Sequence, residues 1–170
     1  MVWGSYFMNG RIIQIGRLQY EYSNEIPYEI AKYKNHDYIK IHIPRGKELN
    51  EDEVDESICR SKNKIKTFYP EIDVSKLLFF TESWLLSNEL DDILDKESNI
   101  IKFKSKFKII KQIENKSDFL NFVFNERKDS IDYNNLQEKT KLQKELKNFF
   151  ISNKKLHIGL GILKDNENIK

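Results

Sequence analysis

The chain has 170 residues, 39% of them hydrophobic and 33% charged, and its 29 Lys and Arg nearly balance 27 Asp and Glu. This length suits one domain with a real core, and the balance of charge argues against a nucleic-acid binder. One cysteine excludes an intrachain disulfide and favours a reducing compartment. The sequence shows neither an apolar stretch of about 20 residues nor an export signal, so we expect a cytoplasmic protein that does not enter the membrane.

The N-terminal segment has the pattern of a β-hairpin. Residues 4–8 and 11–22 flank Asn9-Gly10, the dipeptide best suited to a two-residue turn. Gly16 interrupts the second run, which predicts a bulge that redirects Arg17, Gln19 and Glu21. Residues 23–37 have no clean period and predict a connecting loop.

A strand, a helix and a second strand follow. Residues 38–43 alternate isoleucine with polar side chains, which predicts a strand. Asn50 can cap a helix, with Glu53 as its capping-box partner. Residues 76–81, KLLFFT, are continuously apolar, as in a strand covered on both faces. Together these segments predict a parallel, right-handed βαβ crossover.

Residues 99–110, NIIKFKSKFKII, alternate apolar side chains with four lysines. This period of two predicts a strand with one lysine face. Such a face either protects a sheet edge from aggregation or attracts an anionic partner.

The remaining segments complete an α/β (α+β) fold. The predicted order is β-β-β-α-β-α-β-α-α-β, a mixed, partly antiparallel sheet around the central parallel crossover. We expect one domain over residues 1–163 and a flexible tail over 164–170. The other expected elements are helices at 87–94, 118–124 and about 136–151 and a last strand at 155–163.

This order resembles the later part of the GNAT superfamily of N-acyltransferases. Over about residues 10–163 the chain is similar to the GNAT-like C-terminal domain of a bacterial acyltransferase family, through five segments in register: GRIIQIGRLQYE, HIPRG, ESWLLS, SNIIKFKSKF and TKLQKELKNFF. The resemblance implies acyl transfer from a coenzyme A thioester, as co-substrate, to a small-molecule or peptide amine. Members usually carry a further N-terminal domain, so a separate domain or a homodimer partner is implied. They also usually have a cysteine near the position of Glu82.

The resemblance places the donor beside the strand at 38–43 and the loop PRGKELNEDE. Ile43, Arg45, Gly46 and Lys47 are therefore the candidate coenzyme-binding residues. A helix N-terminus favours a pyrophosphate, but residues 45–56 carry two cations against six anions. That local charge repels phosphate, and the acids also suit a solvated helix start.

The resemblance places the acceptor beside the end of the 76–81 strand. Glu82 and His42 are the candidate bases, because each can take a proton from an ammonium group, and Ser83 lies next to them. Glu82 and Ser83 are equally suited to cap the following helix. His42 is as well explained by a buried structural role.

Three further residues are candidates for substrate binding. Arg17 and Gln19 on the redirected strand are two of them, and Trp84 is the third. A salt bridge for Arg17 and a core position for Trp84 are the competing interpretations. The three histidines lack the spacing of a metal site.

Two functions remain open at this point. The first is a GNAT-type N-acyltransferase that uses acyl-CoA. The alternative is a non-catalytic GNAT-like binding module without coenzyme A affinity, for which the acidic loop is the main argument.

Overall fold

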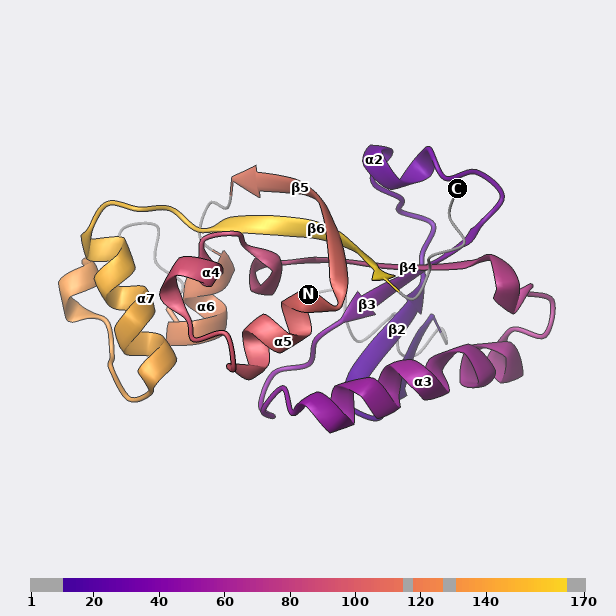
Figure 1. Ribbon diagram of the computed structural model, residues 1–170, viewed down its shortest axis with the longest axis horizontal. Coiled ribbons are helices and arrows are strands. Elements are labelled where there is room, and N and C mark those ends of the chain that lie inside the picture. Colours follow the sequence, from indigo (N-terminus) through magenta and orange to yellow (C-terminus); the bar gives the residue numbers. More distant parts are fainter. Residues whose placement is uncertain (1–10, 115–117, 127–130, 165–170) are drawn as a thin grey trace.

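The computed structural model describes residues 11–114, 118–126 and 131–164 (Figure 1). Their strands form a six-stranded sheet in the order β1-β2-β3-β4-β6-β5. The β3–β4 pair is parallel and the other neighbours are antiparallel, which confirms the mixed sheet. The strands are β1 (Ile12–Ile15), β2 (Leu18–Tyr22), β3 (Asp37–His42), β4 (Leu77–Ser83), β5 (Phe107–Glu114) and β6 (His157–Leu163).

Helices connect these strands and cover the sheet. The α-helices in the described ranges are α2 (Tyr28–Ala31), α3 (Glu51–Phe68), α4 (Leu90–Ile93), α5 (Asn99–Ser105), α6 (Asp118–Phe124) and α7 (Lys141–Ile151). Single 3-10 turns lie between them at η1 (Val74–Lys76), η2 (Trp84–Leu86) and η3 (Tyr133–Asn135).

Helix α3 is the predicted crossover between β3 and β4. The Asn50 side chain accepts a hydrogen bond from the Glu53 amide at 3.2 Å and so caps the helix. Along the helix, the Ser57 hydroxyl lies 3.0 Å from the hydroxyl of Tyr20 on β2. Burial raises the pKa of Tyr20 to about 12, against hydrogen bonds from Ser57 and Ser61, so this phenol stays protonated near neutral pH. The contact fixes α3 against one face of the sheet.

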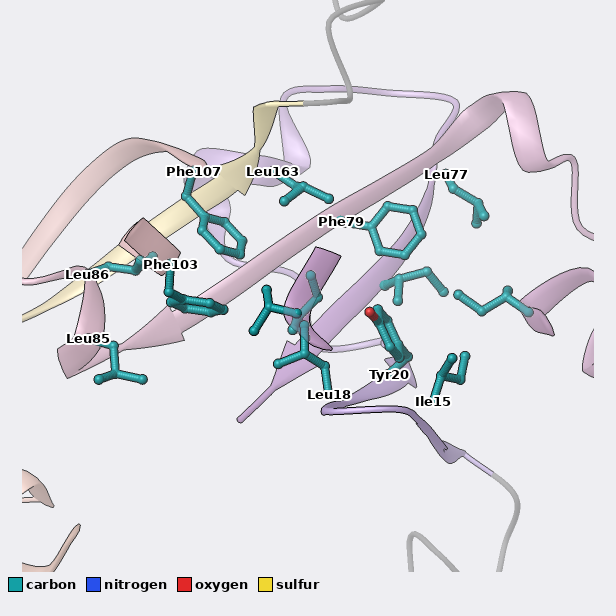
Figure 2. Packing of buried hydrophobic residues seen from close by; sticks show 14 of the residues in the cluster. Ile15, Leu18, Tyr20, Leu77, Phe79, Leu85, Leu86, Phe103, Phe107 and Leu163 are labelled. Carbon is teal, nitrogen blue, oxygen red and sulfur yellow. The ribbon is translucent and has the colours of Figure 1, made fainter. Parts of the chain in front are cut away.

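The main core lies between that face and helices α3 and α5. In Figure 2 the ring of Phe79 stands over Tyr20, with centroids 6.0 Å apart in an edge-on arrangement. Phe103 of α5 packs against Phe107 of β5, with centroids 5.1 Å apart. A second cluster gathers α4, α6 and α7 at one end of the sheet (Figure 1). Trp84 packs against both clusters and so lies where they meet.

The prediction of a bulge at Gly16 was wrong. Gly16 has φ +57° and, with Arg17, forms the two-residue turn between β1 and β2, whose pairing closes at Ile15–Leu18. A residue with positive φ belongs in such a turn as readily as in a bulge. The Asn9-Gly10 turn that we expected lies outside the described residues.

The prediction of one strand over residues 99–110 was also wrong. Residues 99–105 form α5, and β5 begins only at Phe107. The Ser98 side chain caps α5 by accepting from the Ile101 amide at 3.3 Å, and Phe103 is buried. A cap and a buried helical face here outweigh the alternation of the sequence.

Smaller differences concern boundaries. The expected loop at 23–37 contains the short helix α2, and the last helix begins at Lys141 behind the Thr140 cap and not near 136. Most of the expected tail, residues 165–170, lies outside the described ranges. Cys59 is exposed on α3.

Candidate active site

The parallel ladder between β3 and β4 is short. Its described pairs run from Asp37–Leu77 to Lys40–Phe80, although β3 continues to His42 and β4 to Ser83. The two strands separate toward the left of Figure 1. A cleft of about 500 Å³ lies where they part, lined by both strand ends. We call this cleft the slot.

A larger cleft of about 1160 Å³ adjoins the slot and is bordered by the loop before α3. Gly46 in this loop has φ +90°, and no atom lies within 4 Å of the position a Cβ would take. Glycine adopts this conformation without strain. The backbone at Gly46 is therefore open to close approach by a ligand.

Arg17, in the turn between β1 and β2, holds this loop in place. Its side chain is 5% exposed, and it donates from Nε to the Glu48 carbonyl at 2.8 Å and from Nη2 to the Lys47 carbonyl at 2.7 Å. Burial lowers the pKa of Arg17, and the charge of Glu53 opposes that effect. Arg17 thus fixes the course of the loop through backbone contacts.

The acidic start of α3 is compensated by cations from elsewhere in the chain. Lys106 at the end of α5 lies 2.5 Å from Asp55 and 3.9 Å from Glu51. Lys102 reaches Glu51 at 3.2 Å. Arg60 pairs with Glu56 at 2.8 Å, and Lys102 is shared between Glu51 and Glu97, which lies at 3.3 Å. These cations reduce the negative charge that a phosphate would meet at this loop and so weaken the electrostatic argument against it.

The face of β3 opposite α3 carries polar side chains. Ile39 and Ile41 point into the core under α3, so the alternation of the strand directs Lys40 and His42 to the other face. His42 Nε2 lies 2.7 Å from Glu21 Oε2 on β2. Gln19 pairs with His42 in the ladder of β2 and β3.

Burial decides the protonation of His42. It lowers the pKa of the imidazole, while the hydrogen bond and the charge of Glu21 raise it less. A neutral ring that donates from Nε2 to Glu21 carries its lone pair on Nδ1. His42 therefore has the electronic state of a base at neutral pH.

The other candidate base, Glu82, is held in an ion pair. Its Oε2 accepts from Lys40 Nζ at 2.8 Å. Ser83 accepts from the Leu85 amide at 3.2 Å and caps η2. The capping role is thus observed for Ser83 and is not observed for Glu82.

Aromatic side chains form the wall between the two clefts. Trp84 and Phe122 line both. The Arg45 guanidinium lies 4.8 Å from the centroid of the Phe122 ring and donates to the carbonyl of Asn121. Arg45 thus connects the loop to α6.

The predicted site residues gather around these clefts. The slot is lined by Gln19, His42, Ile43, Arg45, Glu82, Ser83 and Trp84. The larger cleft is lined by Arg17, Ile43, Arg45, Gly46, Lys47 and Trp84.

Sequence reasoning missed Glu21, Lys40 and Phe122. Glu21 and Lys40 could have been found, because pairing β2 with β3 places an acid beside a base on one face. Phe122 could not, because only tertiary packing brings α6 to the clefts.

Three solved structures of an acyltransferase share this architecture. They are its complexes with decanoyl-CoA, with decanoyl-CoA and teicoplanin, and with CoA and 10C-teicoplanin. Each superposes with a TM-score of 0.80 at 20%, 21% and 20% identity, and covers 95% of this chain. The chain spans only about half of theirs, at 48%, 49% and 49%. This chain therefore has the same fold as the matching part of that acyltransferase.

The family follows from the sequence itself. The profile of the GNAT-like C-terminal domain matches residues 12–163, and the chain belongs to that family. None of the curated proteins compared with it matches. Across the described ranges, none of the helices combines the length and apolarity that a bilayer span requires. The same ranges bring together no group of three His, Cys, Asp or Glu suited to a metal ion.

Proposed function

We propose that this chain is an acyl-CoA N-acyltransferase domain, with the thioester in the slot between β3 and β4 and the amine on the polar face. The main support for the proposal is that the β3–β4 ladder ends before either strand does. This exposes strand edges beside the loop at Gly46, whose backbone is open to a ligand. An extended amide-containing arm can hydrogen-bond to such edges as an added strand would.

The donor side of the site has groups suited to both ends of a coenzyme A thioester. Arg45, Lys47 and the open backbone at Gly46 suit phosphate. The larger cleft also presents apolar side chains, which suit an acyl chain, and decanoyl-CoA is bound in two of the solved structures. We propose acyl groups of medium length as donors. The apolar residues are Ile43, Pro44, Leu49, Trp84, Leu85, Leu94, Ile100, Phe122 and Leu142.

We assign His42 as the base and Glu21 as the residue that orients it. An amine attacks a thioester carbonyl only after it loses its ammonium proton, and the C–S bond then breaks to release the thiolate. A neutral imidazole with its lone pair on Nδ1 can take that proton, and Glu21 stabilises the imidazolium that forms. Glu82, which also lines the slot, is paired with Lys40. The acceptor that we propose is a small-molecule or peptide amine.

Thermal unfolding with added ligand tests the proposal. Coenzyme A, acetyl-CoA and decanoyl-CoA should each raise the melting temperature, since a ligand at 100 times its dissociation constant stabilises the fold by about 2.7 kcal/mol. Sulfate at the same concentration controls for non-specific anion binding. The absence of any rise at millimolar coenzyme A would leave only the non-catalytic binding module.

A further inference from the structure

Thr81 on β4 is buried with its hydrogen-bonding capacity unused. The residue is 1% exposed, and its hydroxyl has no hydrogen-bond partner among the described residues. A buried hydroxyl without a partner costs free energy, so such groups are rare in folded proteins. An unpaired hydroxyl at a ligand site is commonly completed by the ligand.

The position of Thr81 points to the slot. It is the first residue of β4 beyond the last pair with β3, Lys40–Phe80, and on its other side it pairs with Gly161 of β6. Thr81 lines the slot, together with Ile41 and Leu85. The hydroxyl is therefore a polar group at an otherwise apolar part of the wall.

Two other buried atoms lack an identified hydrogen bond in the described ranges, and neither concerns the slot. Lys104 Nζ lies 2.8 Å from Asp91 and so has an ionic partner. Gln112 uses its amide nitrogen on the Leu86 carbonyl at 3.0 Å, at the far strand β5. Thr81 alone among these three combines an unpaired group with a position on a cleft.

We propose that the Thr81 hydroxyl hydrogen-bonds to an amide of the pantetheine arm of the acyl donor. An amide offers both an N–H and a carbonyl, and a hydroxyl can pair with either. The contact is independent of the acyl group, so free coenzyme A makes it as well as a thioester does. This inference rests on the proposed function, because it requires the donor in the slot.

The test separates stability from affinity. Thr81→Val keeps the branched shape and removes the hydroxyl, so the ligand-free variant should melt at a temperature equal to or above that of the wild type. Its dissociation constant for free coenzyme A, measured by calorimetry, should rise about 3- to 10-fold. Thr81→Ser, which keeps the hydroxyl, should bind within about twofold of the wild type.

Thr67→Val is the matched control. The Thr67 hydroxyl donates to the Asn63 carbonyl at 3.0 Å on the exposed side of α3, away from both clefts. This variant makes the same chemical change and should leave coenzyme A affinity unaltered. Thr81→Ala, a second variant without the hydroxyl, repeats the affinity measurement.

The outcomes distinguish the two proposals. A wild-type chain that does not bind coenzyme A overturns the proposed function. A wild-type chain that binds, with equal affinity in Thr81→Val, overturns only the role of Thr81. A ligand-free Thr81→Val that melts well below the wild type also overturns it, because the hydroxyl would then have its partner within the fold.

Discussion

At the scale of single residues, the contacts of the two candidate bases differ. His42 is kept neutral by burial and is paired with Glu21. Glu82 forms an ion pair with Lys40, and protonation of Glu82 would break that pair. The same strand ends thus supply one group prepared for proton transfer and one that is held in an ion pair.

Replacing His42 by glutamine should lower kcat about 10²- to 10⁴-fold, the usual contribution of a general base. Coenzyme A affinity, measured by calorimetry, should remain close to that of the wild type because His42 serves the acceptor. Glu82→Gln is the comparison, and it should lose less activity than His42→Gln. A larger loss in Glu82→Gln would transfer the role of base to Glu82.

The lowered pKa of His42 predicts a pH dependence of both activity and stability. Activity should fall with acid only below pH 6.5, since the folded histidine protonates below its ordinary value. At pH values between the pKa of His42 in the folded protein and 6.5, the unfolded state binds more protons than the folded state does. The contribution of His42 to stability should therefore be fully present above pH 6.5 and be lost as the pH falls through the pKa of the folded state.

Urea unfolding of the wild type and His42→Gln at several pH values measures this contribution. The loss of stability between pH 7.5 and 5.5 should be smaller in the variant. A wild type that instead gains stability over the variant on acidification would mean that the Glu21 ion pair outweighs burial.

At the scale of elements, the contact between α5 and α3 has an electrostatic role. Lys102 and Lys106 place positive charge on the acidic first half of α3, next to the loop at Gly46. The packing of one helix therefore sets the charge that a phosphate would meet at the start of another.

Lys106→Glu should weaken coenzyme A binding about 3- to 10-fold at low salt, because Asp55 would lose its cation and Glu51 one of its two. The loss should shrink near 1 M salt, where screening reduces the range of charges to about 3 Å. Calorimetry at two salt concentrations measures it. Lys108→Glu makes the same change of charge on the exposed side of β5, and an equal loss there would assign the effect to net charge alone.

The central crossover could be predicted from sequence because its signals are local. Asn50 caps α3 as expected, and the apolar run at 77–81 is buried as β4. The structure of the segment at 99–110 could not be predicted, because Phe103 and Phe107 fit a strand and a helix-to-strand junction equally well. The burial of Phe103 under α5 depends on tertiary packing, and so does the compensation of the α3 acids.

The same division holds for the site. The sequence placed His42, Arg45 and Trp84 at strand ends and loops, where the clefts lie. It did not reveal the partners of these residues, since Glu21 and Asn121 come from separate elements.

At the scale of the whole molecule, the sheet consists of two antiparallel halves. One contains β1, β2 and β3, the other β4, β6 and β5, and the described ladder that joins them ends at Lys40–Phe80. Figure 1 shows the halves parting beyond that point. A ligand in the slot would contact both halves of the sheet at the point where the ladder between them ends.

Hydrogen exchange measured by mass spectrometry tests this view. Coenzyme A should slow exchange at residues 41–43 and 81–83, whose strand edges face the slot, because bound amides open less often. Residues 107–114 of β5, at the far edge of the sheet, provide the internal control. Protection confined to β5 would contradict the proposed position of the donor.

The exposure of Cys59 has a practical consequence. It is the one thiol in the chain, and it stands on the outward side of α3, roughly 12 Å along the helix axis from Glu51. A maleimide fluorophore would therefore attach at a single known point, without engineered mutations. Its emission could report occupancy of the neighbouring cleft in real time.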